Sequence, residues 1–90
     1  MSYRLIYHTY VKNTDLPKID NKNKAMIKRA IKERLATQPE KYGSPLRRTL
    51  KGYWKLSVGD YRVIFKISGY DIFILGIMNI SYPDILKITR

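Results

Sequence analysis

Two stretches near the middle of the chain alternate between apolar and polar side chains with a period of two. They are Tyr53–Val58 and Tyr61–Ile67, both rich in aromatic and β-branched residues, and Gly59-Asp60 separates them. This pattern is typical of half-buried strands that are joined by a tight turn. It predicts an antiparallel β-hairpin.

The alternation sorts the side chains of this hairpin onto two faces. In the second strand Val63 and Phe65 share one face, whereas Arg62 and Lys66 share the other. In the first strand Lys55 lies on the polar face, so it can approach Arg62 across the pair. We therefore expect a cluster of positive charge beside an otherwise buried strand.

Further helices and strands are predicted on both sides of the hairpin. Ile27, Ile31 and Leu35 recur at helical spacing, which indicates a helix with one core-facing stripe. In chain order the expected elements are a strand over Tyr3–His8, a short helix over Thr9–Ile19 that ends near Pro17, a helix over Asn21–Gln38, an irregular basic connection over Pro39–Gly52, the hairpin, an apolar strand over Tyr70–Ile80, and a tail, Ser81–Arg90, that can form a short helix.

This order of elements, β-α-α-β-β-β, predicts an α+β fold. The small sheet should be dominated by antiparallel pairs, with the helices packed on one face. Residues 1–90 are expected to form a single domain, since a chain of this length supports one modest core. The residues expected to contribute to that core are Leu5, Ile27, Ile31, Leu35, Leu56, Val63, Phe65 and Ile74.

The excess of positive charge indicates which classes of molecule this protein can bind. With 18 Lys and Arg residues against 7 Asp and Glu, the formal net charge is +11. Nucleic acid is the leading partner class, because cations that neutralise phosphates release condensed counterions. Membrane phosphates and an acidic protein are the competing interpretations.

Other features of the composition exclude several kinds of site. The chain has no Cys and one His, so we expect neither disulfides nor a metal site, and no cofactor. The longest apolar stretch, Ile72–Met78, is too short to span a bilayer. A soluble cytoplasmic protein without a membrane partner is therefore expected.

The hairpin carries a resemblance to a known family. Lys51-Gly52, Trp54-Lys55 and the run Val58–Phe65, VGDYRVIF, follow a basic helix and precede another apolar strand. In this order of motifs the chain resembles the RelE/ParE family of bacterial toxin–antitoxin modules. The resemblance implies a RelE-like fold and a cognate antitoxin, which we expect to be acidic. RelE-like members cut messenger RNA on the ribosome, whereas ParE-like members poison DNA gyrase.

Cations are suited to cleavage of RNA by its own 2′-hydroxyl, which needs proton transfer and stabilisation of extra negative charge. Lys55 is the candidate general base or proton relay, and Arg62 the candidate for stabilising the transition state. Lys51 can clamp a neighbouring phosphate, with Arg47 and Arg48 as outer contributors to RNA binding. These positions also match basic functional positions of RelE-like toxins. The resemblance thus implies a metal-independent endoribonuclease that acts with the ribosome on messenger RNA.

The chain departs from the family's nucleases at two places. Ser57 stands where a second basic residue is usual, and the stretch Gly76–Ser81 lacks the usual basic cluster and Tyr. Tyr82 lies close to that stretch and is the remaining candidate for contacting RNA. Two alternatives therefore stay open: a ParE-like gyrase inhibitor without nuclease activity, and a degenerate toxin that retains only antitoxin binding.

Several of these residues also have purely structural interpretations. Arg62 can pair with Asp60 or Glu40, and Lys55 can protect the sheet from mispairing. Trp54 and Tyr61 can stack on bases but are expected to pack in the core, and His8 lacks a catalytic partner in the sequence.

Overall fold

The predicted hairpin forms the centre of the sheet. The computed structural model describes residues 2–46 and 52–79, and in it β3 (Tyr53–Val58) pairs antiparallel with β4 (Tyr61–Ser68). Val58 and Tyr61 close the pair around a two-residue turn. Gly59 has a φ of +60° in that turn, a conformation that glycine adopts without steric cost.

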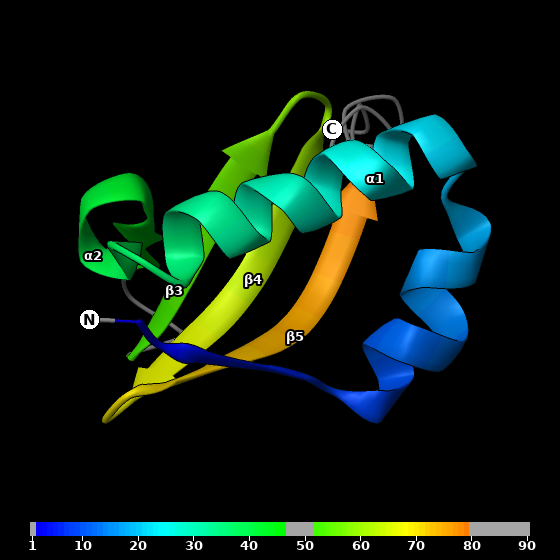
Figure 1. Ribbon diagram of the computed structural model, residues 1–90. Helices are drawn as coiled ribbons and strands as arrows, with labels where there is room; N and C mark the ends of the chain where they lie inside the picture. The colour runs from blue at the N-terminus through cyan, green and yellow to red at the C-terminus, as the bar shows by residue number, and fades with distance from the viewer. Residues whose placement is uncertain (1, 47–51, 80–90) are drawn as a thin grey trace, which may run out of the picture.

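Three other strands complete the described sheet, in the order β1-β5-β4-β3-β2 (Figure 1). They are β1 (Arg4–Tyr7), β2 (Ser44–Pro45) and β5 (Asp71–Asn79). β5 lies between β4 and β1, and it pairs antiparallel with β4 and parallel with β1. The prediction of an antiparallel-dominated sheet is confirmed.

One long helix covers one face of this sheet. It runs as α1 (Asn21–Ala30) and continues through a π-helical turn, η3 (Ile31–Leu35), across the strands (Figure 1). Its Ile27, Ile31 and Leu35 are fully buried, as the helical spacing predicts. On the sheet side Leu56, Val63, Phe65 and Ile74 are buried too, and Leu5 is half-buried against them, so the predicted core is confirmed.

The helical segment before α1 follows the sequence prediction, whereas the connection after the long helix differs from it. Val11–Asp15 (η1) and Leu16–Lys18 (η2) are helical, and this segment ends one residue after Pro17, as predicted. The connection after Gln38 is not irregular throughout: α2 (Pro39–Tyr42) begins with proline, and β2 follows it. The predicted tail helix over Ser81–Arg90 lies outside the described residues. No helix in the described ranges is long and apolar enough to cross a membrane.

Asp20 caps the start of α1, and its carboxylate is held by hydrogen bonds. Its side chain accepts hydrogen bonds from the backbone N–H and the side-chain amide of Asn23, at 3.3 and 2.7 Å. These bonds, the side-chain one first, favour the carboxylate and lower the pKa of Asp20 below its ordinary value of 3.8. A group with a lowered folded pKa stabilises the fold above its unfolded pKa, and this contribution is lost as the pH falls through the folded pKa.

We therefore expect Asp20→Asn to reduce the loss of folding stability at low pH. The amide oxygen of Asn can still accept the Asn23 N–H but does not titrate. Urea unfolding between about pH 6 and about pH 2 should show a smaller loss of free energy of unfolding for the variant than for the wild type. An equal loss of free energy of unfolding in the two proteins would mean that the carboxylate of Asp20 does not contribute to the pH dependence of stability.

Candidate functional site

The sheet face opposite α1 carries the cations that the sequence singles out. We call it the open face. It is made by alternate residues of β3, β4 and β5, whose side chains point away from the core: Tyr53, Lys55, Ser57, Arg62, Ile64, Lys66, Phe73, Gly76 and Met78. The hairpin turn and the antiparallel register fix these side chains in rows, so their relative positions follow from the strand pairing.

Arg62 lies at the hairpin end of this face, as the second residue of β4. It stands opposite Ser57 on β3 and opposite Met78 on β5. Its Nε is buried, yet it has no hydrogen-bond partner. The alternative in which Arg62 pairs with Asp60 or Glu40 is wrong, because the ion pair found within the described ranges joins Arg4 to Asp71. Burying an unsatisfied donor of a cation is unfavourable, so this site is suited to an anionic oxygen supplied from outside.

Lys55 lies on the same face but not directly across from Arg62. Its neighbours across the two strand pairs are Ile64 and Ser44, and Arg62 is its diagonal neighbour on β4. Diagonal neighbours in an antiparallel sheet are still within reach of long side chains. The register therefore makes the two cations diagonal neighbours, and contact between their side chains stays a prediction. Lys55 does not protect an unpaired sheet edge from mispairing, because β2 pairs with β3 at this residue.

A third cation, Lys66, joins this face and was not selected as a candidate from the sequence. Its Nζ lies 5.8 Å from the centroid of the Tyr53 ring, within range of a cation–π contact. The strand alternation that places Arg62 on this face also places Lys66 there. The alternation therefore also predicts Lys66 on this face, whereas the family motif, Val58–Phe65, ends one residue before it.

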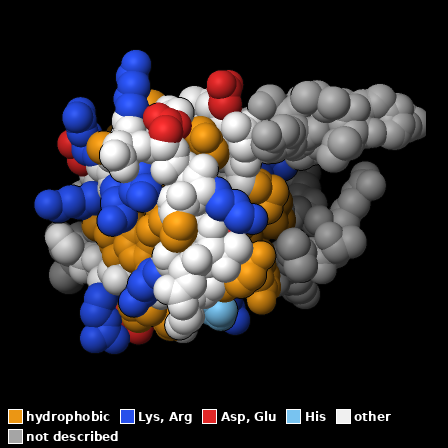
Figure 2. All heavy atoms as spheres, turned by 90° about the vertical axis from the view of Figure 1, so that its right-hand side faces the viewer, with side chains coloured by type: hydrophobic (Ala, Val, Ile, Leu, Met, Phe, Trp, Pro, Cys, Tyr) orange, Lys and Arg blue, Asp and Glu red, His pale blue; other side chains and the backbone are white. Residues whose placement is uncertain are grey.

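Negative charge is scarce on the strands. Asp71 is the one acidic residue in the five described strands, and its carboxylate accepts a 3.0 Å hydrogen bond from Nε of Arg4. Basic side chains also stand out over the side of the molecule seen in Figure 2, between apolar patches. The open face therefore presents Lys55, Arg62 and Lys66 without a free carboxylate from the strands beside them.

The end of β5 is apolar where it borders Arg62. Met78 is 45% exposed and lies directly across from Arg62, and Gly76 lies across from Ile64. The described part of the stretch that lacks Lys, Arg and Tyr, residues 76–79, thus borders Arg62. Arg62 has no cationic neighbour on β5.

Of the other candidate residues, His8, Trp54 and Tyr61 lie within the described part of the chain. His8 is exposed, and its Nδ1 accepts the backbone N–H of Tyr10 at 3.0 Å, which gives it a local structural role. Trp54 and Tyr61 pack against the core, and the Trp54 ring stacks on Phe65 at 6.2 Å, as expected. The remaining RNA-binding candidates, Arg47, Arg48, Lys51 and Tyr82, lie outside the described residues.

Comparisons with solved structures identify proteins of the same architecture. The chain is similar to a chain of the toxin–antitoxin complex RelBE2 from Mycobacterium tuberculosis, with a TM-score of 0.79, 26% identity, and coverage of 88% of this chain and 99% of that one. It is also similar to a mutant of the E. coli toxin RelE in the free state, with a TM-score of 0.73, 15% identity, and coverage of 97% and 93%. The archaeal RelE–RelB complex from Pyrococcus horikoshii gives a TM-score of 0.69, 24% identity, and coverage of 88% and 96%.

Sequence comparison places the chain in a family. The comparison with curated proteins finds no match. The family model described as "ParE toxin of type II toxin-antitoxin system, parDE" matches residues 6–81, which include α1 and all five described strands apart from the first two residues of β1. The chain therefore belongs to the ParE toxin family of type II toxin–antitoxin systems, within the RelE/ParE superfamily.

Proposed function

We propose that this toxin inhibits translation by cleaving messenger RNA on the ribosome, with the open face as its RNA-binding surface. The observation that carries the proposal is the buried Nε of Arg62, which has no partner within a row of like charges. A phosphate oxygen would supply the missing acceptor. The ribosome would position the message, so the toxin needs only a small set of cations to act on one phosphate.

The cleavage step uses the RNA's own 2′-hydroxyl. Its oxygen attacks the adjacent phosphorus, its proton leaves, and the bond to the 5′-oxygen of the next nucleotide breaks, which gives a 2′,3′-cyclic phosphate and a 5′-hydroxyl. Arg62 stabilises the extra negative charge on the phosphate in the transition state. Lys55, its diagonal neighbour, relays the proton of the 2′-hydroxyl to the departing 5′-oxygen. No metal or cofactor is needed for these steps.

The message is held by cations beyond this pair. Lys66 adds charge on the open face, and Tyr53 beneath it offers a ring on which a base can stack. Lys51, Arg47 and Arg48 follow β2 in the chain and are proposed to bind neighbouring phosphates. Tyr82, which follows β5, is proposed to contact RNA as well.

A cognate antitoxin is the second proposed partner. Similar structures come from complexes of RelE with RelB, including an archaeal pair and a RelE mutant bound to a RelB peptide. The net charge of +11 favours an acidic antitoxin, since complementary charge speeds association and aligns the two surfaces.

Inhibition of DNA gyrase is the second candidate function, and two observations favour it. The matching family model describes ParE toxins, and Met78 leaves Arg62 without a cationic neighbour on β5. A degenerate toxin that only binds its antitoxin is the remaining alternative.

One pair of assays separates these functions. Primer extension on a translated message, with and without ribosomes, should reveal new 5′ ends only when ribosomes and toxin are both present. A gyrase supercoiling assay with the same preparation should be unaffected. If the toxin inhibits supercoiling by gyrase and does not cleave the message, inhibition of DNA gyrase replaces the proposed function. If the protein has no effect in either assay and does not inhibit growth, the degenerate toxin is favoured.

Met78→Arg should raise the cleavage rate by about 10-fold, because it places a new cation directly across from Arg62, where the scissile phosphate is proposed to bind. Met78 is 45% exposed, so the longer side chain can be accommodated without a core rearrangement. Initial rates in the ribosome assay measure the effect, with Met78→Leu as the size-matched control. An unchanged rate would place the phosphate away from this end of β5.

A further inference from the structure

A cavity of about 360 Å³ lies at the outer edge of β5, near the hairpin end of the sheet. β1 pairs with β5 over Asp71–Ile74, and beyond Ile74 the segment η1 lies beside this edge. We call the cavity the β5-edge pocket. Its lining includes residues from η1, η2 and both neighbouring strands: Asp15, Lys18, Ile19, Tyr61, Ile77 and Met78.

The β5-edge pocket and the open face share a residue. Met78 lines the pocket, and it also stands directly across from Arg62 in the pairing of β4 with β5. Tyr61, another lining residue, immediately precedes Arg62 in the chain. Paired strands lie about 4.8 Å apart, so a nucleotide whose phosphate binds Arg62 can place its base in the pocket.

The walls of the pocket combine an aromatic ring with a hydrogen-bond acceptor and a donor. Tyr61 is half-buried, because it packs against the core as well as lining the pocket. Oδ2 of Asp15 accepts the backbone N–H of Ile77 at 3.0 Å, which fixes the carboxylate beside the strand. In residues 2–46 and 52–79 no cation forms an ion pair with this carboxylate. Lys18 is exposed and supplies the donor.

These groups match the Watson–Crick edge of guanine. An ionised carboxylate only accepts hydrogen bonds, and its two oxygens have about four lone-pair sites, so the bond from Ile77 leaves room for more. Guanine presents two neighbouring donor groups at N1 and N2, whereas each of the other bases presents one donor group beside an acceptor. The O6 atom of guanine accepts from Lys18, and unstacked bases are commonly packed on Tyr rings.

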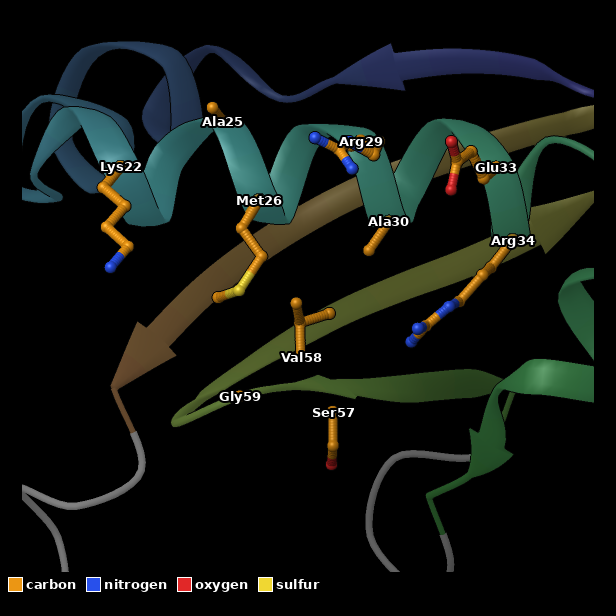
Figure 3. A pocket seen from close by; sticks show the side chains of 10 residues that line it. All are labelled: Lys22, Ala25, Met26, Arg29, Ala30, Glu33, Arg34, Ser57, Val58 and Gly59. Carbon is orange, nitrogen blue, oxygen red and sulfur yellow. The ribbon is translucent and has the colours of Figure 1, made fainter.

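A larger groove, of about 600 Å³, lies between α1 and β3 and provides a comparison (Figure 3). Met26 of α1 points toward Val58 across it (Figure 3). The one acidic residue in its lining is Glu33 of η3. Glu33 therefore offers a carboxylate outside the β5-edge pocket, which can be neutralised as a matched control.

We propose that the β5-edge pocket binds a guanine base of the message, next to the phosphate that Arg62 holds. Asp15 accepts the two donor groups of the base, Lys18 donates to O6, and the ring of Tyr61 packs against it. The message as the source of the base rests on the proposed function. The preference for guanine follows from the lining of the pocket.

Binding of short RNAs tests this preference without ribosomes. The probes are two fluorescein-labelled oligouridines with 2′-O-methyl groups, which prevent attack by the 2′-oxygen, and with a central guanine in one and a central adenine in the other. Fluorescence anisotropy should show that the wild type binds the guanine probe at least about 5-fold more tightly. Equal affinity for the two probes would overturn the proposal.

Asp15→Asn tests the carboxylate. The amide oxygen of Asn can still accept the Ile77 N–H, but its NH₂ group presents donors to the pocket. The preference for guanine should fall below about 2-fold or turn toward adenine, whose N1 is an acceptor. Glu33→Gln removes the same charge outside the pocket and should keep the wild-type preference. An unchanged preference in Asp15→Asn, or an equal loss in both variants, would overturn the proposal.

Lys18→Met is a second probe on an exposed position, where the fold does not depend on the substituted group. It keeps the apolar stem of the side chain but removes the donor to O6, so the preference for guanine should fall by about 3-fold. Circular dichroism of all three variants shows whether each is folded. A folded Lys18→Met protein with the full preference would remove Lys18 from the proposed site.

Two further measurements separate the source of the base from the proposed function. Free 5′-GMP should displace the guanine probe only at concentrations at least about 100-fold above the Kd of the probe, because a single nucleotide lacks the neighbouring phosphates. Equal affinity of 5′-GMP would overturn the assignment to the message. If the wild type cuts messages on the ribosome but neither its cuts nor its binding favours guanine, the pocket proposal fails alone. Guanine-selective binding without any cut contradicts the proposed function and supports the pocket.

Discussion

Arg62→Ala is expected to reduce message cleavage by about 10²- to 10³-fold, the effect typical of removing one preorganised group that stabilises transition-state charge. The loss should appear in kcat rather than in message binding, because Lys55, Lys66 and the distributed surface charge remain. Initial rates of ribosome-dependent cleavage at several message concentrations separate the two parameters.

The same substitution should leave the fold intact or slightly more stable. The Nε of Arg62 is buried without a partner, so its removal leaves no other group unsatisfied. Arg62→Lys keeps the charge but lacks the planar fork, and intermediate activity is expected. Lys66→Ala removes a cation that is proposed to hold the message, so it should weaken message binding and leave kcat nearly unchanged, in contrast to Arg62→Ala. A loss of activity that parallels a loss of folded protein would contradict the proposed role.

Phe65→Ala should destabilise the protein by about 3–5 kcal/mol, which is a large fraction of the stability of a small domain. Phe65 is fully buried at the centre of β4 and stacks on Trp54. Its ring also packs on the backbone at Gly43, where an added Cβ would lie 2.6 Å from Cζ of Phe65. Gly43 has no side chain that could move into the space left by the ring.

Urea unfolding followed by circular dichroism measures this effect. Phe65→Leu keeps most of the apolar volume and should lose less than half as much free energy of unfolding. Gly43→Ala is a complementary probe of the same contact, because it forces the Phe65 ring to move. A loss below about 1 kcal/mol for Phe65→Ala would mean that the ring is not a central part of the core.

Long periodic segments made most of the fold predictable from the sequence. The strands of the hairpin and the helix beginning at Asn21 repeat their patterns over several turns or pleats, so their type and core-facing residues could be assigned. α2 and β2 have four and two residues, too few for a periodic signal, and they were read as irregular.

The candidate site was predictable in its residue types and faces but not in its detail. Alternation alone placed Lys55 and Arg62 on one face. The diagonal arrangement depends on the register of the pair, which the turn fixes, and the unpartnered Nε depends on packing from both neighbouring strands. The groove that Met26 of α1 and Val58 of β3 line joins residues about thirty positions apart in the chain, so no local pattern could indicate it.

The parallel pairing of β1 with β5 has a consequence for synthesis of the toxin. The ion pair between Arg4 and Asp71 spans 67 positions of the chain, so the first strand to be made waits for the last described strand before it acquires its partner. Such long-range pairing raises the contact order and slows the completion of folding. The sheet therefore cannot be completed before β5 has been synthesised, and Arg4 and Asp71 form their ion pair only at that stage.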